Sequence, residues 1–352
     1  MKIRLVILED DKSYLNRITA VFNTKYMDKL EIYSFTSEEG IYRTLAASRI
    51  DVFLAGDAFE IDTQKVPPRC GFAYLVHSSD IESLRGEPAL CKFQKAELIY
   101  KQILNIFAEK TVAITGSGLE GRGRVILFTG AAGGVGCTSA AMGCSMYFAG
   151  RGKKAVYLNL EILGNADGFF RGEGQGNFSD IIYAVKSRKA NLSLKLESLV
   201  KQDTSGAFFF SAPNTALDML ELKPEEISRI IAELKSSCGY DYVILDISMQ
   251  FGKELLNLFQ NCSNVVFVSD GSVTANDKTA RMLRSMDILE EQGEGRRMYD
   301  TGILYNRFSS RNSVKLKESG IREIGGIKRF EECSPRQLCV KISEQDVFRS
   351  LE

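Results

Sequence analysis

A glycine-rich turn between two apolar segments constrains the fold of this chain more than any other feature. Residues 125–160 read VILFTGAAGGVGCTSAAMGCSMYFAGRGKKAVYLNL, so an apolar segment, the turn, a stretch of small residues and a second apolar segment follow one another. This order predicts a strand, a turn, a helix and a second, parallel strand, the unit of a doubly wound α/β sheet. The turn then joins a strand end to a helix N-terminus, which is a place where phosphate groups bind.

The composition of the turn favours a phosphate cradle. Its glycines remove side chains that would keep the backbone from wrapping a phosphate, and Thr138 then begins a helix whose first amides point at the anion. The residues expected to surround the phosphates are Gly133, Gly134, Val135, Gly136, Cys137, Thr138 and Ser139. The alternative is that the glycines only permit close packing between strand and helix. The combined spacing of glycines and hydroxyls favours the cradle.

The turn lacks the cation of an ordinary phosphate-binding loop. The pattern G-x-x-x-x-G-K-[ST] wants glycine and lysine where this chain has Ala131 and Cys137. A hydrogen bond to a charged group contributes about 1.5–3 kcal/mol, so a site with Kd near ~1 µM would weaken to around ~100 µM. Catalysis suffers more, because losing one preorganised donor costs roughly 10²–10³ in rate. The sequence therefore favours nucleotide binding over rapid turnover.

The string GGVG-x-T-S after VILFT resembles the deviant Walker A motif of the ParA/MinD ATPases, whose usual form is KGGVGKTT. Ala132 stands at the position of that family's signature lysine, and Cys137 at that of the ordinary P-loop lysine. The resemblance continues in AFFFSAPNT (207–215), LKPEEISRIIAELKSSCGYDYVILD (222–246) and GILYNRF (302–308). It covers residues 122–352 and implies a larger P-loop domain, with a mostly parallel sheet, helices on both faces, and ATP and Mg²⁺ as ligands.

The same resemblance assigns roles to two carboxylates. YDYVILD resembles a Walker B strand ending in Asp246, which would hold Mg²⁺ through water while Thr138 supplies a direct oxygen. The alternative for Asp246 is a residue that merely begins a loop. YLNLEILGNAD resembles the switch I strand, with Asn159 and Glu161 where the family carries two aspartates. Glu161 keeps a carboxylate that could orient water, so Glu161 and Asp246 are the catalytic candidates.

Asn306 follows the apolar strand GILY and matches the family's adenine-contacting asparagine. An amide can both donate to and accept from one edge of adenine, although asparagine is also a common turn residue. Residues 334–336 are the candidates for the opposite wall of the base pocket.

Residues 1–110 predict a second, smaller doubly wound α/β domain. Apolar strands alternate with amphipathic helices over this region. The expected strands are 2–8, 31–35, 51–55, 72–76 and 89–93, and the expected helices include 12–26 and 96–110.

This domain resembles the receiver domains of two-component signalling. The residues that carry the resemblance are the acidic pair Glu9 and Asp10, the switch hydroxyl Ser78, and Lys92 after the fifth strand. The alternative for residues 9–11 is a solvated acidic loop.

The phosphoacceptor position departs from the receiver pattern. Counting along DVFLAGD puts Gly56 at that position and Asp57 one residue late, and a slip of one residue turns a side chain to the other face of a strand. We therefore expect an atypical receiver that is not phosphorylated, with Asp57 as the residue to test.

An atypical receiver followed by a ParA/MinD-type ATPase, with KFQ after the last receiver strand, resembles the TadZ/CpaE proteins of Tad (Flp) pilus assembly. The resemblance implies a localisation factor that acts as an ATP-bound homodimeric scaffold with weak or no hydrolysis, together with other Tad pilus components. The alternative is an active ParA-type ATPase that binds nonspecific DNA. The expected boundaries are 1–110 for the receiver, 111–124 for a linker and 125–352 for the ATPase, whose loop 163–180 is expected to face a partner or the second protomer.

Composition is consistent with a cytoplasmic protein. Lys plus Arg and Asp plus Glu number 45 each, so no net charge draws the chain to nucleic acid, and we expect no nucleic-acid partner. The eight cysteines form no CxxC pair, which favours a reducing compartment. No apolar run approaches the ~18 residues of a membrane span, so a location at the inner face of the membrane or at a cell pole would depend on partners.

Overall fold

The computed structural model describes residues 2–110, 123–187, 191–249, 252–291, 299–309, 311, 313–316 and 320–352. By contacts the chain divides into two compact units, Met1–Gly116 with Ser187–Leu199, and Ser117–Lys186 with Val200–Glu352. The segment Ser187–Leu199 therefore belongs to the first unit, although the chain on either side of it belongs to the second. A single boundary at the linker does not describe this division. The linker expected at 111–124 lies outside the described residues except for its last two positions.

The first unit contains a six-stranded sheet in the order β2-β1-β3-β4-β6-β5. The parallel strands are β1 (Ile3–Leu8), β2 (Leu30–Phe35), β3 (Val52–Gly56), β4 (Gly71–Val76) and β6 (Glu87–Cys91), and β5 (Ser83–Leu84) is antiparallel to β6. The helices are α1 (Lys12–Lys25), α2 (Ile41–Ala47) and α3 (Ala96–Lys110), with a 3₁₀ turn η1 at Thr63–Lys65. The predicted doubly wound α/β class is confirmed.

This sheet is covered on both faces. The side chains of β1 and β3 alternate between two apolar clusters, one packed with α1 and α3 and the other with α2. Strands buried on both faces read as continuous apolar runs, which is why they are recognisable in the sequence. Asp11 begins α1 as its N-cap, where its carboxylate accepts hydrogen bonds from the amides of Ser13 and Tyr14.

Helix α6 (Leu192–Leu199) is the excursion that packs on α3. Leu194 of α6 packs against the apolar cluster that contains α1 and α3. Lys195 Nζ donates to Asn105 Oδ1 at 2.5 Å and lies 3.5 Å from the Glu109 carboxylate, both on α3.

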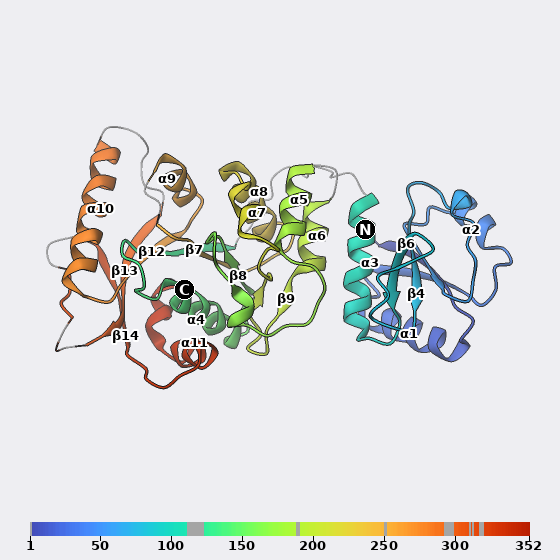
Figure 1. The fold of residues 1–352 in the computed structure, drawn as a ribbon, viewed down its shortest axis with the longest axis horizontal. Coiled ribbons are helices and arrows are strands. Elements are labelled where there is room, and N and C mark those ends of the chain that lie inside the picture. Colours follow the sequence, from blue (N-terminus) through green and yellow to red (C-terminus); the bar gives the residue numbers. More distant parts are fainter. Residues whose placement is uncertain are drawn as a thin grey trace. The chain divides into compact units, whose positions relative to one another are not determined.

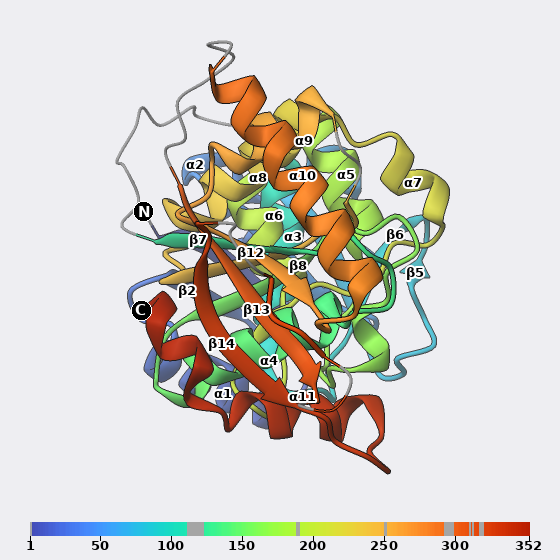
Figure 2. The ribbon, with the colours of Figure 1, turned by 90° about the vertical axis from the view of Figure 1, so that its left-hand side faces the viewer.

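The second unit contains an eight-stranded sheet in the order β14-β13-β12-β7-β11-β8-β10-β9. Its strands are β7 (Arg124–Thr129), β8 (Ala155–Asn159), β9 (Lys201–Gln202), β10 (Phe208–Phe209), β11 (Tyr242–Asp246), β12 (Asn264–Ser269), β13 (Asp300–Phe308) and β14 (Arg322–Lys328). All neighbours are parallel except β9 and β10. Figure 2 shows β13 and β14 side by side at the edge of the sheet.

Helices lie on both faces of this sheet (Figure 1). They are α4 (Cys137–Gly150), α5 (Phe178–Ser187), α7 (Ala216–Leu220), α8 (Pro224–Lys235), α9 (Lys253–Phe259), α10 (Val273–Glu291) and α11 (Pro335–Ser343), with 3₁₀ turns η2 (Ala166–Gly168) and η3 (Asp346–Leu351). Helix α4 lies between the sheet and α11 and is buried along most of its length. A Cβ at Gly143 would lie 2.4 Å from Ile342 Cγ2, so this glycine allows α11 to approach α4 closely.

Candidate functional site

Residues 130–136 connect β7 to α4 and form the predicted phosphate loop. Gly134 and Gly136 have φ of 73° and 90°, the left-handed region that glycine adopts without strain. A Cβ built at Gly133 or Gly134 meets no atom within 4 Å, so this side of the loop is open. Gly136 differs, because a Cβ there would lie 2.2 Å from Asn306 Nδ2.

Asp246 ends β11, the strand between β7 and β8, and lies level with Phe128 and Asn159. Its carboxylate is fully buried, and Tyr157 Oη donates to Oδ2 at 2.7 Å. Asp246 Oδ1 has no hydrogen-bond partner among the described residues. Burial, and next the negative charge of Glu161, raise the pKa of Asp246 to about 7, while the nearby hydroxyls of Tyr157 and Thr138 oppose the shift.

Thr138, Glu161 and Asp246 come together beside the loop. Thr138 Oγ1 donates to Glu161 Oε2 at 3.4 Å, and Ser248 Oγ donates to Glu161 Oε1 at 2.8 Å. Hydroxyl and carboxylate oxygens are the ligand types that Mg²⁺ prefers. The buried Asp246 Oδ1 without a partner is the specific sign that these residues fit a cation.

Asn159 takes no part in this cluster. Its Oδ1 accepts a hydrogen bond from the Glu161 amide at 2.8 Å, which closes a local turn. The side chain packs so tightly on Gly164 that a Cβ there would lie 2.1 Å from Asn159 Nδ2. Of the two switch I positions, only Glu161 reaches the cluster.

The Cys137 side chain does not lie on the open side of the loop, where Gly133 and Gly134 are. A Cβ at Gly130 would lie 2.7 Å from Cys137 Sγ, so the thiol occupies the space behind the loop. Burial, with the charge of Asp246 next, raises the pKa of Cys137 far above its ordinary value. The side chain is therefore a neutral thiol that supplies neither a cation nor a nucleophile.

Two consecutive residues near the end of β13 hold the loop backbone. Asn306 is buried, and its Nδ2 donates to the Val135 carbonyl at 2.9 Å. The guanidinium of the exposed Arg307 donates to the Gly134 carbonyl. The adenine contact of Asn306 stays a prediction, and the bond to Val135 uses one of the two N–H groups of the side-chain amide. Reasoning from the sequence missed Arg307, although a cation directly after Asn306 was a signal.

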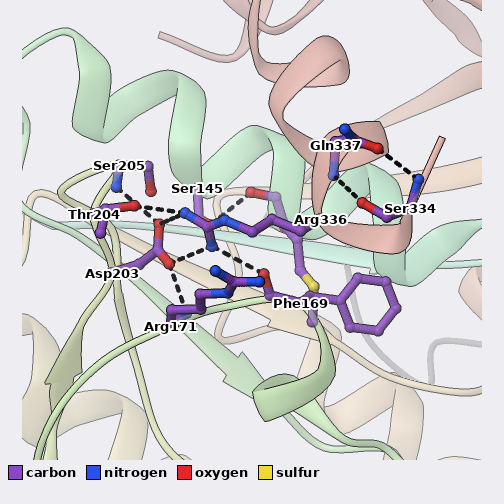
Figure 3. A network of polar contacts seen from close by, with 10 residues as sticks. Ser145, Phe169, Arg171, Asp203, Thr204, Ser205, Ser334, Arg336 and Gln337 are labelled. Carbon is purple, nitrogen blue, oxygen red and sulfur yellow. Dashed lines mark hydrogen bonds and ion pairs between the residues drawn. The ribbon is translucent and has the colours of Figure 1, made fainter.

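Residues 334–336 stabilise α11. Arg336 donates to both carboxylate oxygens of Asp203, at 2.6 and 3.1 Å, and to the Phe169 carbonyl at 3.1 Å (Figure 3). Ser334 caps the helix by accepting a hydrogen bond from the Gln337 amide. Arg336 is thus engaged in an ion pair, and the base-pocket wall predicted here stays a prediction.

In the first unit, Glu9 and Lys92 form a buried ion pair with Oε1 and Nζ 3.0 Å apart. Burial raises the pKa of Glu9, and the neighbouring Asp10 carboxyl group adds to the shift. Glu9 Oε2 has no partner among the described residues and lies 3.1 Å from where a Cβ at Gly56 would be. Glu9 is therefore not part of a solvated loop, and its carboxylate lies against the position where a receiver carries its phosphoacceptor.

Asp57 follows β3 and pairs with the only histidine of the chain, His77, at 3.0 Å. Asp10 is exposed, and Ser78 exchanges hydrogen bonds with Asp80. Within the described ranges, no group of three or more His, Cys, Asp and Glu side chains is arranged to hold a metal ion.

Residues 1–108 match the family model described as TadZ-like, receiver domain, which confirms the predicted resemblance for this part of the chain. No curated protein matches the sequence significantly.

Several solved structures resemble about two thirds of this chain in fold. They include a ParA family ATPase from Chlorobium tepidum (18% identity, 65% of this chain and 91% of that chain, TM-score 0.48) and the cell division ATPase MinD from Pyrococcus furiosus (14%, 65% and 100%, 0.47). A McdA–ATP complex from Cyanothece is 13% identical, with 66% and 97% coverage and a TM-score of 0.49. At such identities and scores, none of these likenesses bears on what this chain binds. No helix within the described ranges is long and apolar enough to cross a bilayer.

Proposed function

We propose that this chain is an ATP-binding localisation factor of the Tad pilus type, which binds ATP and Mg²⁺ in its second unit and hydrolyses ATP slowly or not at all. The observation that carries the proposal is the unpartnered, buried Asp246 Oδ1 beside a glycine loop whose outer side is open. The TadZ-like receiver match over residues 1–108 supports the pilus context.

Thr138 and Asp246 would hold the magnesium ion, Thr138 directly and Asp246 through water. A bound Mg²⁺ neutralises phosphate charge and favours the ionised carboxylate. Since the pKa of Asp246 is about 7 without metal, part of the protein population must lose this proton when the cation binds. Tyr157 keeps the other carboxylate oxygen fixed at 2.7 Å.

We expect slow turnover because the loop lacks two cationic side chains. The two lysine positions of the deviant Walker A motif hold Ala132 and Cys137, and each missing donor costs roughly 10²–10³ in rate. Glu161 is the remaining candidate to orient water, with Asp246 beside it. Both Glu161 oxygens accept hydrogen bonds from hydroxyls, at 3.4 and 2.8 Å, and each oxygen keeps a second lone pair with which it can orient a water.

The scaffold role requires a second protomer or a partner, and loop 163–180 is the proposed surface. Leu163 is 87% exposed and borders a groove of about 580 Å³ beside Glu161. A large exposed leucine beside a groove favours a protein contact at this loop. We infer a homodimer that acts in the cytoplasm and reaches the membrane or a pole through other Tad components.

Calorimetry with ATP, in Mg²⁺ and in EDTA, beside a steady-state ATPase assay tests this proposal. Gly133→Val should abolish binding without unfolding the chain, because the added side chain enters the open side of the loop. Gly150→Val is the matched control, since Gly150 is also exposed and has no atom within 4 Å of its Cβ position. Undiminished ATP binding by Gly133→Val would refute the site, and rapid turnover by the wild type would refute the slow-hydrolysis part.

A further inference from the structure

We propose that Arg307, acting with Asn306, holds the phosphate loop in its anion-binding conformation and supplies the positive charge that Ala132 and Cys137 do not. The inference rests on the proposed function, because it concerns the polyphosphate of the same nucleotide. Arg307 thus has two roles in the site: its hydrogen bond positions the loop, and its charge attracts the phosphates.

The two side chains fix successive peptide groups of the loop. Arg307 binds the Gly134 carbonyl, and Asn306 binds the Val135 carbonyl at 2.9 Å. In a trans peptide the C=O and the following N–H point in opposite directions. The amides of Val135 and Gly136 therefore point away from the two donors, which leaves them to face an anion.

The backbone of β13 is distorted at the residue that makes this contact. Arg307 has φ of 54°, in the left-handed region that is costly for a residue with a side chain. The register between β13 and β14 shifts between Asn306 and Phe308, so Arg307 is the extra residue of a bulge. Bulges turn a side chain away from its regular direction, and here the side chain is turned to the phosphate loop.

Arg307 also brings a cation into contact with the loop, through its hydrogen bond to the Gly134 carbonyl. Its side chain is exposed, so the guanidinium is accessible to a ligand at the loop. A guanidinium is always protonated and binds phosphate through several donors, which suits a loop without lysine.

The test compares ATP, inorganic tripolyphosphate and adenosine by calorimetry on the full chain. Arg307→Met should weaken ATP and tripolyphosphate by roughly 10- to 100-fold, the usual effect of losing a charge-assisted hydrogen bond, and leave adenosine unchanged. Arg307→Lys should recover part of the loss. Arg329→Met is the matched control, because Arg329 is 69% exposed and forms only a surface ion pair with Glu331. Wild-type tripolyphosphate affinity in Arg307→Met, or an equal loss for adenosine, would overturn the proposal.

A second measurement separates this inference from the proposed function. The amide resonances of Val135 and Gly136 in the ligand-free protein should shift in Arg307→Met and stay in place in Arg329→Met. If the wild type binds no ATP while these amides shift, the proposed function fails and the role of Arg307 in holding the loop stands. Unshifted amides would show that Arg307 does not position the loop.

Discussion

Replacing Asp246 by asparagine should stabilise the metal-free protein, and the gain should grow with pH. The pKa of Asp246 rises from 3.8 to about 7 in the folded state, because burial disfavours the charge. The folded state therefore binds this proton more tightly than the unfolded chain, and wild-type stability falls as pH rises from about 4 to 7. Asparagine does not titrate, and its oxygen can still accept the hydrogen bond from Tyr157.

The magnitude follows from the shift. A difference of about 3 pKa units at 1.36 kcal/mol each corresponds to a wild-type penalty of about 4 kcal/mol at pH 8 and about 2 kcal/mol at pH 5. The variant's advantage in unfolding free energy should therefore increase by about 2–3 kcal/mol between these pH values. Taking the difference between two pH values removes any constant effect of the substitution itself.

Urea unfolding in EDTA at pH 5 and pH 8 measures this change. Asp241→Asn is the control, because Asp241 directly precedes the same strand and is exposed. Adding ATP and Mg²⁺ at pH 8 should stabilise the wild type and have little effect on Asp246→Asn, whose amide cannot replace the carboxylate at the cation. Parallel pH profiles of variant and wild type in EDTA would refute the idea that Asp246 is a strained, buried carboxylate.

Four further outcomes are expected. Lys92→Met should destabilise the first unit by about 3–5 kcal/mol in urea unfolding, because it leaves the buried charge of Glu9 unpaired. Adding Glu9→Gln should restore most of the lost stability, and an unchanged unfolding free energy in Lys92→Met would contradict this reasoning. A small phosphodonor should leave the intact mass unchanged, and a phosphoryl gain that Asp57→Asn abolishes would show a working receiver. Cys137→Lys should tighten ATP by one to two orders in calorimetry, about 1.5–3 kcal/mol, in the Arg307→Met background, and by much less when Arg307 is present; an equal gain in both backgrounds would mean that Arg307 does not serve the phosphates. Sedimentation should show a homodimer that depends only weakly on ATP, and a monomer at concentrations well above micromolar with and without ATP would exclude the scaffold.

The elements that the sequence predicts well are those whose signal is local. The buried strands of both units are continuous apolar runs, and a run of this kind places Asp246 at a strand end. The glycine spacing likewise predicts the loop before α4, since positive φ at Gly134 and Gly136 is a backbone requirement that glycine meets.

The features that the sequence did not predict depend on residues far apart in the chain. The contact of Arg307 with Gly134 requires a bulge in β13, and no local pattern marks that bulge. The glycine at 136 was expected to admit phosphate, whereas its hydrogen also makes room for the Asn306 amide. The Asn159 side chain lies against Gly164 because its Oδ1 accepts a hydrogen bond from the Glu161 amide in a local turn. This turn keeps the side chain out of the site.

The docking of α6 on α3 limits where this protein can be divided. A truncated chain that begins at residue 125 would keep α6 and lose α3, which would leave the Leu194 side chain without its apolar cluster and the Lys195 ammonium without Asn105 and Glu109. A fragment that ends at residue 110 would in turn uncover the part of α3 that binds Lys195. Because the chain enters the first unit twice, a single protease cut in 111–124 would leave the two products held together by this helix pair.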